Sequence, residues 1–226
     1  MATATLPPAA TEAPGCVTLY GISWDFYERF LEETRDQRVR HFYDEGVLTI
    51  MSPLGLPHEW NKKLIGQMIE ALTEELGIPR RSVGALTLKS SPALKGAEPD
   101  ESYYIAHEPQ MRGRRRFDPT RDPPPDLLVE VDITSPSLDR LPIFAALGVP
   151  EVWVYDGSEL RPYVLRKNGS YRKSKTSRAF PFLPFAEFAA WLRKAEAMDE
   201  TSWIRAFRAW VREQFEDLRR STEKSQ

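Results

Sequence analysis

Apolar residues recur at helical spacing over the middle of the chain. From Trp60 to Leu76 they return every three or four positions, which gives a helix one apolar face. Pro57 stands where the first turn of a helix tolerates proline, and Gly77 ends the pattern. The spacing therefore predicts a long helix between Pro57 and Gly77.

Four other segments show the helical pattern: 24–31, 138–147, 185–194 and 202–218. Ser23 can cap the first of them. Pro142 lies inside the second, so its regular part is expected to begin near that residue, and Gly148 is a typical helix stop. The last segment carries an apolar stripe of Trp203, Phe207, Trp210, Val211 and Phe215. Such a stripe is more typical of packing or a dimer contact than of a ligand site.

Short runs rich in Val, Leu, Thr and Tyr, bounded by turn residues, predict β-strands. The predicted strands are 39–43, 47–51, 82–89, 98–105, 126–133, 151–156, 161–167 and 170–175. Asp44-Glu45-Gly46 between the first two and Asn168-Gly169 between the last two are hairpin signals. The chain is thus expected to alternate helical and strand segments.

The composition limits the classes of protein to which the chain can belong. With 226 residues, of which 41% are hydrophobic, it can bury one core. The single cysteine, Cys16, excludes an internal disulfide and fits a reducing compartment. The first residues lack the basic flank and apolar stretch of a signal peptide, and no later run is long enough to span a membrane. We expect a cytoplasmic protein without a membrane partner, with a flexible tail (1–16), a main domain (17–195) and a C-terminal helix (196–226).

The net charge of the chain is compatible with a basic surface in one local region but not over the whole protein. A net charge of -2 argues against sequence-independent coating of nucleic acid, which needs a strong positive excess. One run of arginines, Arg112, Arg114, Arg115 and Arg116, follows the predicted strand 98–105. It is a candidate DNA-binding loop, with Lys62 and Lys63 as helpers, although most charge runs are simply solvated.

Acidic side chains gather on one face of the predicted strand 126–133. Alternation places Asp126, Leu128, Glu130 and Asp132 on one face, with Leu127, Val129 and Val131 on the other. Buried carboxylates cost roughly several kcal/mol unless a cation or hydrogen bonds compensate them. Asp126 and Asp132 can equally sit at exposed strand ends, whereas Glu130 is enclosed by apolar neighbours. With Asp100, Glu130 forms an acid pair that suggests a site for a divalent metal.

Three strings carry a family resemblance: Glu98-Pro99-Asp100, Val129-Glu130-Val131 through Ser135-Pro136-Ser137, and Leu147-Gly148-Val149-Pro150-Glu151-Val152-Trp153. Their order resembles the PD-(D/E)xK nuclease core and, from about Val39 to Trp191, the Uma-two family of restriction endonucleases. The resemblance implies an α/β fold with a restriction-endonuclease-like mixed β-sheet core flanked by helices, an N-terminal β-hairpin and C-terminal helices. It also implies hydrolysis of DNA phosphodiester bonds with magnesium, or manganese as a substitute, and a homodimer.

Carried over by position, the resemblance assigns Asp100 and Glu130 as metal-binding acids and the main-chain carbonyl of Val131 as a further ligand. Asp132 departs from the pattern, because a nuclease of this fold places lysine there. In relatives that lysine often moves to the next helix, four residues before an aromatic, and counting back from Phe144 gives Arg140. A guanidinium can steady phosphate charge but is a poor proton acceptor.

Lys89, on the strand before Asp100, is the other candidate for the missing cation. Alternatively, Lys89 is simply an exposed residue at the edge of the sheet. His58 and Glu59 open the long helix, where family members often carry a similar pair. Glu59 is a candidate third metal ligand, or an acid favoured there by the helix dipole alone. His58 is a candidate phosphate contact, or a cap of the first turn.

Three functions remain open from the sequence. The first is a metal-dependent endonuclease using Asp100 and Glu130, with Arg140 or Lys89 as the cation. The second is a catalytically inactive nuclease-fold protein that binds DNA or another protein, motivated by Asp132 and the negative net charge. A general acid–base hydrolase such as a glycosidase ranks last, because no aromatic sugar platform surrounds the acids.

Overall fold

The computed structural model describes residues 15–37, 39–51, 55–133 and 139–218, which form two β-sheets. The first sheet has the spatial order β1 (Cys16–Leu19), β3 (Val47–Met51), β2 (His41–Asp44), β6 (Lys95–Ala97) and β5 (Leu88–Ser90). The second has the order β11 (Tyr171–Lys173), β10 (Leu160–Leu165), β9 (Glu151–Tyr155), β8 (Leu127–Val131), β7 (Glu101–Tyr104) and β4 (Arg81–Ser82). Among the described strands only β8 and β9 pair in parallel, so the second sheet is mixed, as predicted.

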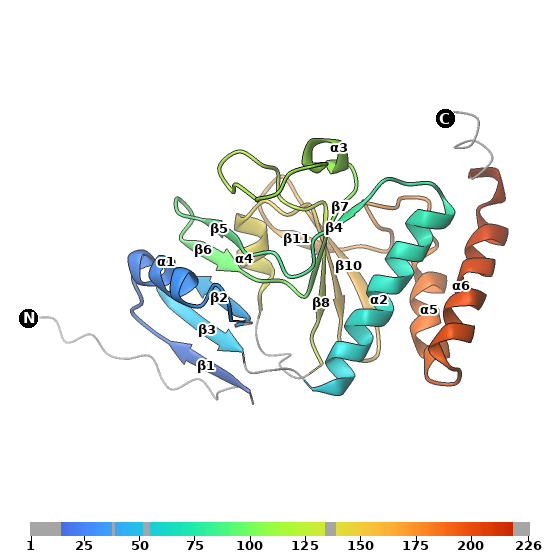
Figure 1. The fold of residues 1–226 in the computed structure, drawn as a ribbon, viewed down its shortest axis with the longest axis horizontal. Coiled ribbons are helices and arrows are strands. Elements are labelled where there is room, and N and C mark those ends of the chain that lie inside the picture. The colour runs from blue at the N-terminus through green and yellow to red at the C-terminus, as the bar shows by residue number, and fades with distance from the viewer. Residues whose placement is uncertain (1–14, 38, 52–54, 134–138, 219–226) are drawn as a thin grey trace, which may run out of the picture.

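Helices flank both sheets (Figure 1). Their bounds are α1 (Trp24–Glu33), α2 (Leu56–Glu75), α3 (Glu108–Met111), α4 (Leu141–Ala146), α5 (Phe185–Ala195) and α6 (Glu200–Gln214). The predicted ends are confirmed: Ser23 Oγ accepts the N–H of Phe26 at 3.2 Å, and the left-handed Gly77 and Gly148 follow the C-terminal ends of α2 and α4. None of the helices in the described ranges has both the length and the apolar content needed to span a bilayer.

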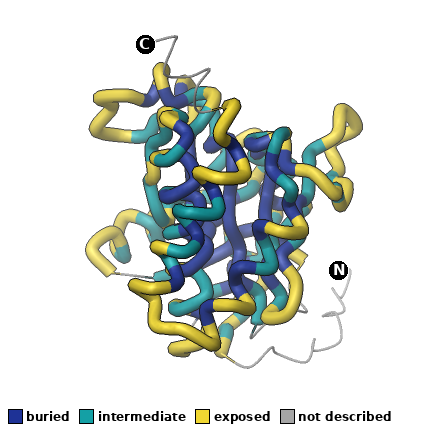
Figure 2. Tube along the Cα trace, turned by 90° about the vertical axis from the view of Figure 1, so that its right-hand side faces the viewer, coloured by how far each residue is buried: buried dark blue, intermediate teal, exposed yellow. Residues whose placement is uncertain are grey.

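The layers follow from the two faces of the second sheet. Leu127, Val129 and Val131 of β8 pack against α2, α5 and α6, whereas Leu128 packs against α4 and the first sheet. The alternation predicted for this strand is therefore confirmed. The apolar stripe of α6 lies inside the first of these cores, where Trp203 and Phe207 are fully buried. Figure 2 shows the buried residues gathered along the central strands and the inner sides of the helices.

Both predicted hairpins are confirmed. Between β2 and β3, Glu45 and Gly46 have φ values of 45° and 97°, the left-handed pair that a tight two-residue turn requires. Between β10 and β11, Gly169 has a φ of 77°, and the side chain of Asn168 accepts the N–H of Ser170 at 3.2 Å. The N-terminal hairpin is part of a larger sheet, which the sequence did not predict.

Several boundaries differ from the sequence prediction. The predicted strand 82–89 is wrong as a single element: it divides into β4 and β5, which lie in different sheets, and the left-handed Gly84 lies between them. The predicted strand 98–105 is shorter, because Glu98-Pro99-Asp100 connects β6 in the first sheet to β7 in the second. β1 and α3 were not predicted. Ser135-Pro136-Ser137 lies outside the described residues.

Candidate active site

Asp100 and Glu130 face each other across two neighbouring strands. Asp100 directly precedes β7, and Glu130 lies on β8, which pairs with β7 in antiparallel register. The N–H of Asp100 donates to Glu130 Oε1 at 3.2 Å, and the N–H of Val131 donates to Asp100 Oδ2 at 2.8 Å. Both side chains are almost fully buried. The structure therefore brings the two acids together, with the N–H of Val131 beside them; the predicted role of the Val131 carbonyl as a metal ligand stays a prediction.

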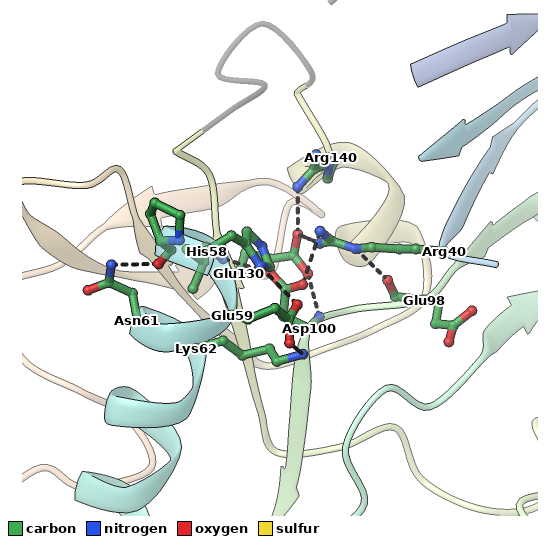
Figure 3. A network of polar contacts seen from close by, with 11 residues as sticks. Arg40, His58, Glu59, Asn61, Lys62, Glu98, Asp100, Glu130 and Arg140 are labelled. Atoms are coloured by element: carbon green, nitrogen blue, oxygen red, sulfur yellow. Dashed lines mark hydrogen bonds and ion pairs between the residues drawn. The ribbon is translucent and has the colours of Figure 1, made fainter. Parts of the chain in front are cut away.

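Two guanidinium groups compensate the acid pair (Figure 3). Arg40 bridges the two acids, with Nη1 3.0 Å from Asp100 Oδ1 and Nη2 2.8 Å from Glu130 Oε2. Arg140 Nη1 donates to the same Glu130 oxygen at 2.9 Å. Both guanidiniums lie over the ring of Phe42, at 5.3 Å and 4.6 Å from its centroid. Two positive groups thus meet two negative ones in a site with little solvent.

His58 holds Asp100 from the side of α2. Its Nε2 lies 3.2 Å from Asp100 Oδ2, and its Nδ1 lies 3.3 Å from Glu59 Oε1. Glu59 in turn pairs with Lys62 at 2.7 Å. The His58 side chain is completely buried, so in this structure it holds Asp100 in position, and the DNA contact expected from the sequence stays a prediction. Glu59 is joined to Asp100 through the imidazole rather than lying beside it.

Burial and nearby charges move the pKa values of the two carboxyls in opposite directions. Burial alone would raise the pKa of Asp100, but Arg40, His58 and the N–H of Val131 outweigh it and hold that pKa below its ordinary value. Burial raises the pKa of Glu130, and the charge of Asp100 adds to this rise against the effect of the two arginines. As the pH falls, Glu130 is therefore expected to take up a proton before Asp100 does.

Two pockets meet at Arg140. One, of about 210 Å³, is lined by Glu130, Asp132 and Arg140 among others, and the other, of about 200 Å³, reaches Phe42 in the first sheet. Asp139 and Arg140 line both. Asp132 Oδ1 is buried and has no hydrogen-bond partner among the described residues, and burial raises the pKa of Asp132. The position at which the family resemblance leads us to expect lysine thus carries a carboxylate beside the acid pair.

Lys89 does not join the acid pair. It lies on the edge strand β5 of the first sheet, where its Nζ pairs with Glu28 Oε2 of α1 at 2.5 Å. Of the two candidate cations, Arg140 is the one that reaches Glu130, whereas Lys89 contacts an acid of α1.

The arginine run lies at the other end of the strands. It belongs to the connection between the end of β7 and the start of β8, whereas Asp100 precedes β7 and Glu130 is near the end of β8 (Figure 1). β7 has 4 residues and β8 has 5, so at about 3.3 Å per residue the two ends of this strand pair are roughly 15 Å apart. Arg112 pairs with Glu108 at 2.5 Å, Arg114 lies 3.8 Å from Asp122, and Arg115 and Arg116 are exposed. One phosphate cannot contact both places.

Arg40 is the site residue that the sequence analysis missed. It precedes β2, and its partners Asp100 and Glu130 are far along the chain, Glu130 by 90 residues. The available signal was weak: one arginine between Val39 and the buried run His41-Phe42-Tyr43, in a predicted strand. No spacing rule connects such a residue to an acid in another sheet.

Substitution of His58 is expected to destabilise the site measurably. His58→Leu leaves Asp100 Oδ2 without its imidazole partner in a buried place, so the free energy of unfolding should fall by about 2 kcal/mol. Urea unfolding at neutral pH measures it. Asn61→Ala on the same turn, which removes only a side-chain bond to Pro57 O, is the matched control and should cost less than about 0.5 kcal/mol. Equal losses in the two variants would contradict the positioning role.

The donor chemistry of the site fits a hard divalent cation. Asp100 and Glu130 supply carboxylate oxygens, the ligands that magnesium prefers, and the orphaned Oδ1 of Asp132 adds another in the same place. Within the described ranges, no three His, Cys, Asp or Glu side chains already converge as a metal centre. Each oxygen of the acid pair instead faces a guanidinium, the imidazole or an amide N–H.

Comparisons with known proteins identify the family of the chain. The model of the family Uma2, described as "Putative restriction endonuclease", matches residues 24–193. A solved structure described as a putative nuclease belonging to DUF820 from Anabaena variabilis is 17% identical, covers 76% of this chain and 90% of that chain, and superposes with a TM-score of 0.41. Comparison with curated proteins gives no match. Because the family match extends over well more than half of the sequence, the chain belongs to the Uma2 family of restriction-endonuclease-like proteins.

Proposed function

We propose that the protein is a metal-dependent endonuclease that hydrolyses phosphodiester bonds of DNA. The observation that carries this proposal is the buried pair of Asp100 and Glu130 on adjacent strands, in a chain of a nuclease family. Acids in such a place are costly to bury, so their presence is better explained by a chemical role than by stability.

Asp100 and Glu130, with the carbonyl of Val131, would hold Mg²⁺ or Mn²⁺. A bound divalent cation neutralises charge on the phosphate and lowers the pKa of a water molecule that attacks phosphorus. His58 and Glu59 keep Asp100 oriented, as partners of metal-ligating carboxylates commonly do.

Arg140 takes the place of the lysine found in related nucleases. Its Nη1 faces Glu130, while its Nε is buried without an acceptor among the described residues, between the two pockets. A phosphate oxygen in either pocket would satisfy that donor, so Arg140 would bind the phosphodiester and stabilise the charge that develops during hydrolysis.

The exposed Arg115 and Arg116 would contact the DNA backbone at a distance from the cleaved bond, because their loop lies at the other end of β7 and β8. Their contribution would be to affinity rather than to chemistry. The homodimer and the cytoplasmic location stay predictions.

The test is cleavage of supercoiled plasmid and of single-stranded DNA by the purified protein, over a range of Mg²⁺ and Mn²⁺ concentrations. Nicked, linear or shortened products are expected, and EDTA should stop their formation. Asp100→Ala is the control for contaminating nucleases. If the protein never cuts more than that control, the proposed function is wrong.

A second candidate is an inactive nuclease-fold protein that binds DNA or a protein partner. It is favoured by Asp132 at the lysine position and by the arginines that already neutralise the acid pair. Binding of a labelled duplex without any cleavage, and without calorimetric binding of Mn²⁺, would support it over the endonuclease.

A further inference from the structure

The guanidinium of Arg40 lies between the two carboxylates that form the candidate metal site. One of its terminal nitrogens is 3.0 Å from Asp100 Oδ1 and the other is 2.8 Å from Glu130 Oε2, so the two ends of its fork engage one acid each. Its Nε also donates to the main-chain oxygen of Glu98 at 3.3 Å. Figure 3 shows Arg40 reaching the acids from the side opposite His58.

A metal ion bound by both carboxylates would contact the same oxygen atoms that the guanidinium of Arg40 contacts. Divalent metals bind carboxylate oxygens at about 2.0–2.6 Å, so an ion that used both acids would have to approach the oxygen atoms now facing Arg40. The remaining oxygens are engaged as well: Asp100 Oδ2 by His58 and the N–H of Val131, and Glu130 Oε1 by the N–H of Asp100. Little of the acid pair is left for an additional cation while Arg40 stays in place.

The charge count gives the same result. Asp100 and Glu130 carry two negative charges, Arg40 and Arg140 carry two positive ones, and all four side chains are largely buried. A divalent cation added to these four side chains would leave two positive charges in excess, and the carboxylate of Asp132 in the neighbouring pocket would offset only one of them, which is unfavourable where there is little solvent. Protonation of Glu130 would make the cluster still more positive, so the conclusion does not depend on that proton.

We propose that Arg40 is an internal competitor of the metal ion, whose side chain must leave the acid pair before Mg²⁺ or Mn²⁺ binds there. This inference rests on the proposed function, and it assigns Arg40 a positioning role: the residue keeps the two acids together without metal and sets how tightly metal binds. Removal of Arg40 should therefore strengthen metal binding. A residue with a purely structural role would weaken it or leave it unchanged.

The test is Mn²⁺ binding to the full-length protein, measured by calorimetry and by the loss of the free Mn²⁺ paramagnetic resonance signal. Arg40→Gln should bind Mn²⁺ at least about tenfold more tightly than the unmodified protein, since one competing charge is removed. Arg40→Lys keeps the charge but loses the two-pronged fork, so a smaller rise of about threefold or more is expected. Lys89→Gln removes a cation of the first sheet that pairs with Glu28. The Mn²⁺ affinity of this variant should stay within about twofold of that of the unmodified protein.

Thermal unfolding with and without Mn²⁺ gives an independent measurement. Arg40→Gln should be less stable than the unmodified protein in EDTA, because two buried acids lose their shared partner, and Mn²⁺ should raise its melting temperature by more. If Arg40→Gln does not fold, the Mn²⁺ affinity of Arg40→Lys tests the proposal instead. An affinity equal to or below that of the unmodified protein in the folded variants would overturn the proposal.

The outcome is separable from that of the cleavage test. Suppose that the unmodified protein cleaves DNA but the Arg40 variants bind metal no more tightly. The endonuclease function would then be supported, and the competition between Arg40 and the metal ion would be excluded. Tighter Mn²⁺ binding by the variants without any cleavage by the unmodified protein would support the competitor and contradict the endonuclease.

Discussion

Glu130→Gln is expected to lower the rate of DNA cleavage by about a thousandfold or more at saturating Mg²⁺. Glutamine keeps the size of the side chain and a carbonyl oxygen that can accept the N–H of Asp100, but it removes the negative charge that would bind the metal. The two guanidiniums on Oε2 then lose their shared anion. Single-turnover cleavage of a labelled duplex, with the folded fraction checked by circular dichroism, measures the effect.

Glu187→Gln is the matched control for this loss. Glu187 is exposed in the first turn of α5, on the helix layer of the second sheet, and its substitution should leave the cleavage rate within about twofold. Cleavage by folded Glu130→Gln at a rate near that of the control would exclude Glu130 from the chemistry.

Gly96→Ala is expected to destabilise the first sheet by about 3 kcal/mol or more. Gly96 lies on β6, and the ring of Tyr27 covers it so closely that an added Cβ would come within 2.5 Å of Tyr27 Cζ and 2.6 Å of Cε1. Tyr27 cannot move aside easily, since its ring stacks on Tyr43 with centroids 4.5 Å apart and its hydroxyl lies 3.0 Å from His41 Nε2. Urea unfolding gives the loss.

A double-mutant cycle identifies the cause. Tyr27→Ala should cost less stability in the Gly96→Ala background than in the unmodified protein, because loss of the ring there also relieves the clash, with a coupling of at least about 1 kcal/mol. Gly66→Ala in α2, where the added Cβ would lie 3.2 Å from Tyr103 Oη, is the comparison and should change stability by less than about 1 kcal/mol, because alanine also favours the helix. Strictly additive losses for Gly96 and Tyr27 would refute a steric origin.

Features that depend on neighbours in the sequence could be predicted. The turn at Glu45-Gly46 and the one at Asn168-Gly169 need left-handed residues at fixed positions, and the sequence carries them there. The alternation along β8 likewise predicted which side chains face the helices, because one face of a strand repeats every second residue. The acid pair followed from the same alternation together with the family resemblance.

Features that depend on which strands meet could not be predicted. The segment 82–89 has the composition of one strand, yet its two ends belong to different sheets. One continuous strand and two short ones can be told apart only by their pairing, which is β4 with β7 and β5 with β6. β1 begins at Cys16, the last residue of the segment predicted as a tail, and gains its structure from pairing with β3. Arg40 has an ordinary position in a predicted strand, and its contact with Glu130 follows only from the placement of the first sheet against the second.

The acid cluster joins parts of the molecule that are distant in the chain. Arg40 comes from the first sheet, His58 from α2, and Asp100 and Glu130 from the edge where the chain crosses into the second sheet. Contacts of such high sequence separation form late in folding, after the entropy of closing long loops has been offset. A fragment that carries only one of the two sheets would therefore lack part of the cluster, because Arg40 precedes a strand of the first sheet and Glu130 lies on a strand of the second.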